Sequence, residues 1–210
     1  MKYLLGFILL VGIISCNDTA TSSTIPSEPR PKILPKDSNI INGEMANAYV
    51  PVDVSPMDMA WLPVDYPKLT IKKSSPVARV IYSRPHKQGR KIFGNVVKYG
   101  ERWRLGANEA TEIETFVPVT IQNKKVPKGK YILYCIPEAD KWTIVFNSNL
   151  NSWGLNLDPS KDLYRFTIPA QTKNQTVEYF SMVFQPTSSG ADLVMAWDNV
   201  EARLPIQYNY

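Results

Sequence analysis

The stretch Val177-Glu-Tyr-Phe-Ser-Met-Val-Phe184 decides the fold class of this chain. β-Branched and aromatic residues dominate it, and residues two apart form sets that face opposite ways. This period of two is the period of a β-strand, in which successive side chains point to opposite faces of the sheet. Beyond the first fifteen residues, few windows carry the period of an amphipathic helix. The sequence therefore predicts an all-β protein.

Similar segments follow one another from Ser55 onward, separated by turn-forming residues such as Pro127-Lys-Gly129 and Ser188-Ser-Gly190. We expect strands over residues 68–73, 77–83, 112–116, 119–122, 130–136, 142–147, 163–168, 176–185, 192–197 and 201–206. Many short strands in about 150 residues are typical of an antiparallel β-sandwich or a jelly-roll-like barrel. Residues 55–210 are thus predicted to form one β-domain.

The first sixteen residues have the pattern of an export signal. Lys2 precedes an apolar run over residues 3–14, and Ser15 stands directly before Cys16. A run this short cannot span a bilayer, which needs about 20 apolar residues, so residues 1–15 are predicted to be a signal peptide. The order Ile13-Ile14-Ser15-Cys16 resembles a bacterial lipobox, which implies that Cys16 is lipidated with a fatty acyl group such as palmitate. The alternative is an ordinary cleaved signal followed by a coincidental cysteine.

Residues 16–54 are predicted to be a tether. Up to about residue 39 the segment is rich in Ser, Thr and Pro, a composition that buries too little apolar surface to fold. Residues 49–52 can instead pack on the domain as an arm. Because Asn17 rather than Asp follows Cys16, we expect a lipid-anchored protein of the cell envelope, in the outer membrane and facing the periplasm or the cell surface.

The formal net charge of +5 would suit a nucleic-acid partner in the cytoplasm, but export removes that partner. Anionic headgroups or acidic glycans are then the expected counter-charges. Once Cys16 is acylated, Cys135 is the only remaining thiol, and its apolar surroundings predict a small buried hydrophobe. With one histidine, His86, and no acidic metal-binding loop, we expect neither a metal nor any other cofactor.

The segment from Tyr82 to Thr111 is the strongest candidate for a functional site. It is a long connection between two predicted strands, and its glycines are interspersed with Arg84, Arg90 and Arg104. Guanidinium groups suit planar anions, so these arginines can converge on a carboxylate, sulfate or phosphate. The structural alternative is that Glu109 is the anion they contact, in a buried network that pins the loop.

Trp103 and Asn108 complete the predicted ligand-binding set of Arg84, Arg90, Trp103, Arg104, Asn108 and Glu109. A tryptophan ring can stack on a saccharide, although a tryptophan among strands more often belongs to the core. Core packing is the expectation for Trp142 and Trp197, whereas Trp153 in a turn-rich segment can serve either role. Glu112 and Glu114 share one face of a predicted strand; acid–base catalysis is possible there, but a solvated face is the simpler interpretation.

Seven motifs resemble one bacterial family of exported proteins, the domain of unknown function family twenty-nine-eleven. They are Ser-Pro-Met-Asp (55–58), Tyr-Ser-Arg-Pro (82–85), Gly-Arg-Lys-Ile-Phe-Gly (89–94), Trp-Arg-Leu-Gly-Ala-Asn-Glu-Ala-Thr (103–111), Gly-Lys-Tyr-Ile-Leu-Tyr (129–134), Lys-Trp-Thr-Ile-Val-Phe-Asn (141–147) and Trp-Gly-Leu (153–155). The resemblance covers Ser55 to Ile206. It implies an exported protein with one folded domain, and it transfers no activity and no catalytic residue.

The expected function is therefore a non-enzymatic binding or scaffold module for an anionic or saccharide ligand. One alternative is a glycan-directed hydrolase that uses Glu109 as acid or base. Another is a structural partner in an outer-membrane assembly, with the region near Tyr49 or Trp61 as its contact surface. The sequence names neither the ligand nor the oligomeric state.

Overall fold

The computed structural model of the protein describes residues 54–68 and 75–209, and almost all of their regular structure is β-strand. Nine strands pair antiparallel in one sheet of order β1-β2-β3-β6-β7-β8-β9-β4-β5. The predicted all-β antiparallel fold is confirmed. The predicted signal peptide, Cys16 and the tether up to residue 53 lie outside the described residues, as does most of the strand expected over 68–73.

The strands are β1 (Met57–Leu62), β2 (Ala78–Ser83), β3 (Thr111–Thr115), β4 (Val119–Ile121), β5 (Lys124–Val126), β6 (Gly129–Pro137), β7 (Lys141–Asn147), β8 (Asp162–Thr187) and β9 (Gly190–Gln207), with two short 3-10 helices, η1 (Tyr66–Lys68) and η2 (Pro159–Lys161). The sequence pattern did not predict β1 or β5. At β5 the chain turns through Gln122 and Asn123, both with positive φ, and then pairs with β4 at once. Such a two-residue hairpin turn makes the next residues a strand, whereas the sequence analysis expected no strand between residues 122 and 130.

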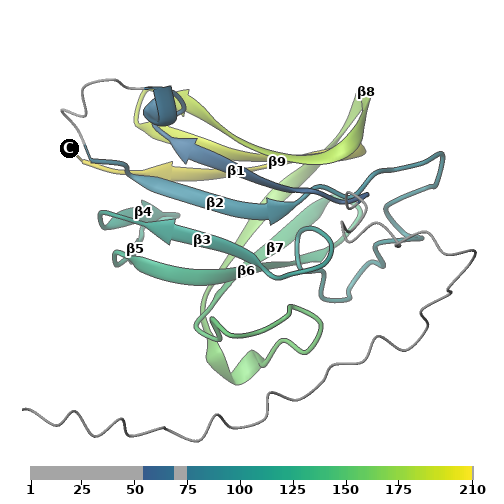
Figure 1. The fold of residues 1–210 in the computed structure, drawn as a ribbon, viewed down its shortest axis with the longest axis horizontal. Helices are drawn as coiled ribbons and strands as arrows, with labels where there is room; N and C mark the ends of the chain where they lie inside the picture. Colours follow the sequence, from purple (N-terminus) through teal and green to yellow (C-terminus); the bar gives the residue numbers. More distant parts are fainter. Residues whose placement is uncertain (1–53, 69–74, 210) are drawn as a thin grey trace, which may run out of the picture. The chain divides into compact units, whose positions relative to one another are not determined.

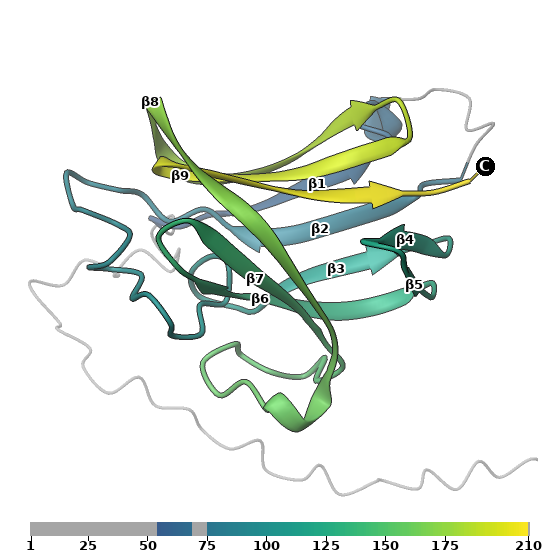
Figure 2. The same ribbon diagram turned by 180° about the vertical axis from the view of Figure 1, so that it is seen from behind.

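Strands β8 and β9 each join two segments that the sequence analysis had separated. β8 pairs with β7 through Pro169 and with β9 from Ala170 onward. Thr172 and Val177 are five residues apart on β8, but their partners on β9, Val200 and Asp198, are only two residues apart. The ribbon therefore has a large β-bulge at this point. Figures 1 and 2 show the β8–β9 ribbon turning back on itself at this point. The polar residues between the two predicted segments therefore form a bend in one strand.

The larger of two buried apolar clusters fills the space that the curved sheet encloses. Phe166 and Ile168 come from the first part of β8, and Phe180 and Met182 come from the part beyond the bulge. In β9 the inward positions change from odd numbers, ending at Trp197, to even numbers, starting at Ala202. Asp198, at φ 53°, stands where this change occurs. One bent ribbon thus supplies the core from both of its halves.

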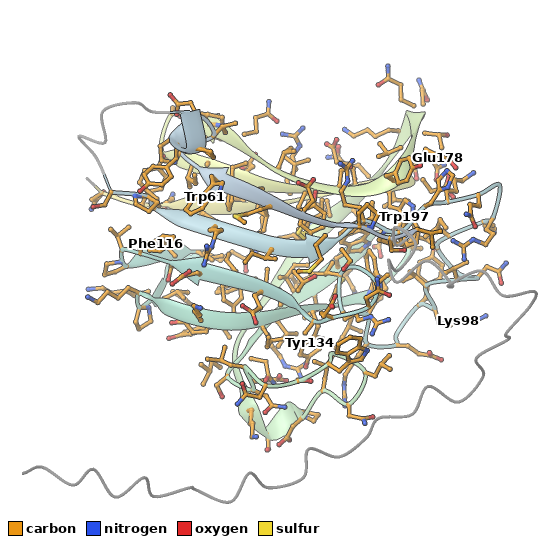
Figure 3. All side chains as sticks on the ribbon, in the orientation of Figure 1. Trp61, Lys98, Phe116, Tyr134, Glu178 and Trp197 are labelled. Carbon is orange, nitrogen blue, oxygen red and sulfur yellow. The ribbon has the colours of Figure 1, made fainter. Side chains whose placement is uncertain are left out.

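The long connection between β2 and β3, residues 84–110, lies at one end of this sheet, as the sequence predicted. Figure 3 shows Lys98, Trp197 and Glu178 at that end, and Trp61 and Phe116 at the opposite end. No helix in the described ranges is long and apolar enough to cross a membrane.

Candidate functional site

The β2–β3 connection is held to the sheet by backbone hydrogen bonds at two places. The amide and carbonyl of Trp103 bond to the carbonyl and amide of Cys135 on β6, each at 2.8 Å. Closer to β2, Lys87 N donates to Glu178 O at 2.8 Å and Phe180 N donates to Pro85 O at 3.0 Å. The connection therefore continues the strand pairing beside both β6 and β8, which positions its backbone at these two places.

Gly106 marks the closest approach of the connection to the sheet. Its φ is 154°, and a Cβ placed on it would lie 2.9 Å from the carbonyl oxygen of Ser83. Its own carbonyl accepts a hydrogen bond from Trp103 Nε1 at 3.2 Å. A larger residue would push the chain away from β2, which explains the need for glycine at this point.

A surface hollow of about 460 Å³ opens in the connection, and we call it the arginine hollow. Arg90, Arg102 and Arg104 line it, together with Trp103 and Trp197. Its remaining lining is mostly apolar or backbone: Val54, Ser55, Pro85, Gln88, Val96, Val97, Gly106, Ala107, Gly154 and Leu155. Its volume lies in the range of small-molecule sites.

Among the described residues, the three arginines of the hollow bond only to backbone carbonyls. Arg90 donates from Nε to Lys87 O at 2.9 Å and from Nη2 to His86 O. Arg102 Nη1 donates to Leu157 O at 3.1 Å, and Arg104 Nη1 donates to Asn108 O. A guanidinium has five N–H donors, so more than half of the donors on each arginine have no partner among the described residues. These charges are fixed in place but are not neutralised.

The other four arginines of the described part each contact a carboxylate. Arg79 pairs with Glu114, Arg84 with Asp58, Arg165 with Asp162, and Arg203 with Glu201 and Asp192. Within residues 54–68 and 75–209, the arginines without a carboxylate within 4.0 Å are the three that line the hollow. The fold thus brings together, at one place, the described arginines that lack a carboxylate partner.

The alternative network, in which Glu109 binds all three predicted arginines, does not form among the described residues. Arg84 has Asp58 as its carboxylate partner, at 3.2 Å, and Arg90 bonds to carbonyls. Burial lowers the pKa of Arg104, and the charge of Glu109 opposes that shift without a contact of ion-pair length. Glu109 is half-buried and is not among the lining residues of the hollow.

Of the six predicted ligand-binding residues, the structure brings together Arg90, Trp103 and Arg104. Arg84 lies in a neighbouring hollow of about 420 Å³ with His86 and Tyr179, where it also bonds to Ser181 Oγ at 3.0 Å. Asn108 is not among the lining residues of the arginine hollow, although its carbonyl accepts a hydrogen bond from Arg104. The two predicted acid–base candidates, Glu112 and Glu114, do share the solvent-facing side of β3.

Trp103 belongs to both the core and the hollow. Its ring lies 4.9 Å from Phe180 and stacks on Trp197 with centroids 5.9 Å apart. It remains half-buried and lines the hollow together with Trp197. Trp142 and Trp197 are buried, as predicted, whereas Trp153 is 57% exposed. The indoles of Trp103 and Trp197 therefore give the hollow an apolar floor.

The other chemically reactive side chains have structural surroundings. Cys135 is buried, and burial raises the pKa of its thiol well above the usual value, so it is the inert hydrophobe expected. His86 Nε2 lies 2.8 Å from Glu178 and its ring stacks on Tyr179. No group of His, Cys, Asp and Glu side chains in the described ranges could hold a metal ion.

Sequence reasoning missed Arg102, Trp197 and Leu155 as parts of this site. Arg102 lies one residue before the Trp103–Arg104 pair, so its basic charge in that motif was a usable signal. Trp197 is 94 residues away from Trp103 in the chain, and Leu155 lies in the segment between β7 and η2. Only the folded chain brings these residues to the hollow.

Comparison with known sequences identifies the family of the domain that builds this site. A search of curated proteins and a search of solved structures find no match. The family model described as "Protein of unknown function (DUF2911)" matches residues 67–206, which include eight of the nine strands and the connection that carries the hollow. The chain therefore belongs to the DUF2911 family of proteins of unknown function.

Proposed function

We propose that this protein is a lipid-anchored, non-enzymatic binding module of the cell envelope, and that its ligand is an anion held in the arginine hollow. The observation that carries the proposal is the division among the arginines. Of the seven arginines in residues 54–68 and 75–209, four contact carboxylates, and the three that contact none within those ranges all line one hollow. Guanidinium groups with free N–H donors bind the oxygens of carboxylate, sulfate or phosphate through paired hydrogen bonds.

The rest of the lining supports a ligand that is more than a bare ion. Trp103 and Trp197 form an aromatic floor, and aromatic rings suit the apolar face of a saccharide. A volume of about 460 Å³ accommodates a small molecule with an anionic group at one end. A phosphorylated or sulfated sugar has both features, and we take it as the model ligand.

The proposed location rests on the sequence alone. The short apolar run that ends in Ile13-Ile14-Ser15-Cys16 supports lipidation of Cys16 after export. A lipid anchor and a tether would keep the domain near a membrane surface in the envelope. The hydrolase alternative gains no support from the hollow, because Glu109 does not line it.

Calorimetric titration tests the proposal on the chain from Asn17 to Tyr210, which lacks the signal segment and Cys16 and keeps every described residue. The probes are glucose 6-phosphate, inorganic sulfate and glucose. We expect glucose 6-phosphate to bind best and glucose worst. Arg102→Gln should weaken the binding of glucose 6-phosphate by about tenfold or more, since a hydrogen bond to a charged group contributes about 1.5–3 kcal/mol.

Lys128→Gln is the matched control. Lys128 is an exposed cation between β5 and β6, it has no ion pair within the described ranges, and it is not among the residues of the hollow. This variant should bind like the unmodified chain. Equal losses in the two variants, or equal binding of glucose and glucose 6-phosphate, would contradict an anion site in the hollow.

A further inference from the structure

Exposed apolar side chains surround the arginine hollow. Val54 and Leu155, both in its lining, are 72% and 69% exposed. Val96, also in the lining, is exposed, and so is Trp153 beside Gly154. Large apolar side chains grouped on a surface mark a place where another surface covers them. The arginine hollow therefore has an apolar rim, formed by Val54, Val96 and Leu155, and the exposed Trp153 is the sequence neighbour of its lining residue Gly154.

Further cations lie in the same connection. From Arg90 to Arg104 the chain has five basic residues and one acidic residue, Glu101. None of the five basic residues has a carboxylate within 4.0 Å in the described part of the chain. Figure 3 shows Lys98 at the end of the domain where Trp197 lies, far from Trp61 and Phe116. Positive charge and exposed apolar groups thus share one end of the domain.

The chain also enters the described domain at this rim. Its first described residue is Val54, a lining residue of the hollow, and the preceding 53 residues include Cys16. If Cys16 is acylated, Val54 and Ser55 of the lining are the described residues that lie nearest to the anchor along the chain.

We propose that the arginine hollow and its apolar rim dock directly on a bilayer that contains anionic phospholipids. The lipid phosphates would bind Arg90, Arg102 and Arg104, and the rim side chains would enter the boundary between headgroups and acyl chains. Basic residues attract an anionic leaflet, and neighbouring apolar and aromatic side chains add buried area in the interface. This inference rests on the anion binding proposed above and names phospholipid as the source of the phosphate.

Vesicle co-sedimentation tests the docking, again on the chain from Asn17 to Tyr210, so that no acyl group contributes. One set of vesicles is pure phosphatidylcholine, and the other contains about one quarter phosphatidylglycerol. We expect binding to the anionic vesicles to be at least about tenfold tighter and to weaken as salt is raised. Arg102→Gln and Leu155→Ser should each reduce that binding by about threefold or more.

Two control variants remove the same chemistry at the other end of the domain. Val64→Ser changes a 56% exposed side chain between β1 and η1, and Lys128→Gln changes an exposed cation before β6. Both should sediment with anionic vesicles like the unmodified chain. Equal losses in the controls and in the hollow variants would overturn the docking surface, and so would equal binding to the two kinds of vesicle.

The calorimetric titration separates the two proposals. If glucose 6-phosphate binds and anionic vesicles do not, the membrane inference fails and the anion site stands. If neither binds, both fail. If both bind and Arg102→Gln weakens both, the hollow is an anion site that takes the phosphate of phospholipids at a membrane surface.

Discussion

Arg104 and Glu109 show how two oppositely charged residues can be neighbours without forming an ion pair. Arg104 donates to the carbonyl of Asn108, and Glu109 affects it only through its field. The sequence suggested that Glu109 anchors the connection between β2 and β3. In the structure the anchors are backbone hydrogen bonds to Cys135, Glu178 and Phe180. Neither these anchors nor an ion pair among the described residues occupies the guanidinium groups of Arg90, Arg102 and Arg104.

Glu109→Gln should change the free energy of unfolding by no more than about 0.5 kcal/mol, because no ion pair of the described chain is lost. Urea titration measures this change. Glu114→Gln is the control, since Glu114 pairs with Arg79 at half-buried positions on β3 and β2. That variant should lose about 1–3 kcal/mol. A loss in Glu109→Gln as large as the loss in Glu114→Gln would restore the anchoring role of Glu109.

The β8–β9 ribbon requires a particular residue type at its hairpin turn. Its hairpin turn ends at Gly190, which has φ 154°. A Cβ on this residue would lie 2.1 Å from the carbonyl oxygen of Ile206, near the other end of β9. Backbone atoms cannot move aside as a flexible side chain can. The fold therefore depends on glycine at this position.

Gly190→Ala should destabilise the protein by about 2 kcal/mol or more, through steric overlap with the backbone as well as φ strain. Gly89→Ala is the matched control, because Gly89 also has positive φ, at 70°, but a Cβ there meets nothing within 4 Å. That variant should lose only about 1 kcal/mol, the usual cost of φ strain. Thermal or urea unfolding of both variants compares the two effects; equal losses would mean that the ribbon adjusts around Gly190.

Tyr82 joins β2 to β8 and should make stability fall at high pH. Its hydroxyl accepts a hydrogen bond from Met182 N at 2.9 Å, and burial raises its pKa from 10.0 to about 12. Between these values the unfolded chain has released the proton and the folded chain still holds it. Raising the pH through this interval therefore favours unfolding, and the full stabilisation is present below pH 10.

Over that interval the unmodified protein should lose about 2–3 kcal/mol more stability than Tyr82→Phe, which cannot titrate at this position. Urea titrations at a series of pH values up to about 12 measure the difference. The other tyrosines titrate in both proteins, so their contributions cancel in the comparison. Identical pH profiles would show that Tyr82 ionises as readily in the folded state as in the unfolded state.

For the whole molecule, the proposed location depends on the N-terminal segment that precedes the described domain. Cys16→Ala should abolish incorporation of a fatty-acid analogue and release the protein from membranes or leave an uncleaved precursor. Metabolic labelling followed by membrane fractionation measures both effects. Cys135→Ala, at the buried thiol, is the control and should be labelled like the unmodified protein. Normal maturation of an unlabelled wild-type protein would contradict the anchor.

The sequence by itself determined the fold class, most of the strands and the family. It also singled out the stretch from Tyr82 to Thr111 and three residues of the hollow. These features are local: a period of two shows which face of a strand is apolar, and a motif is read along the chain. Sequence alone also supports the export signal, which stays a prediction.

Only the tertiary structure decided which arginines are neutralised. Arg84 and Arg104 look alike in the sequence, but Arg84 pairs with Asp58 on β1, whereas Arg104 has no carboxylate within 4.0 Å in the part of the chain that the structure describes. The sequence also predicted neither the bend of the ribbon at residues 173–177 nor the presence of Trp197 and Leu155 in the lining of the hollow. Ion pairs and the lining of a cavity form between residues that are far apart in the chain. Their distances from one another are set only when the chain folds around its core.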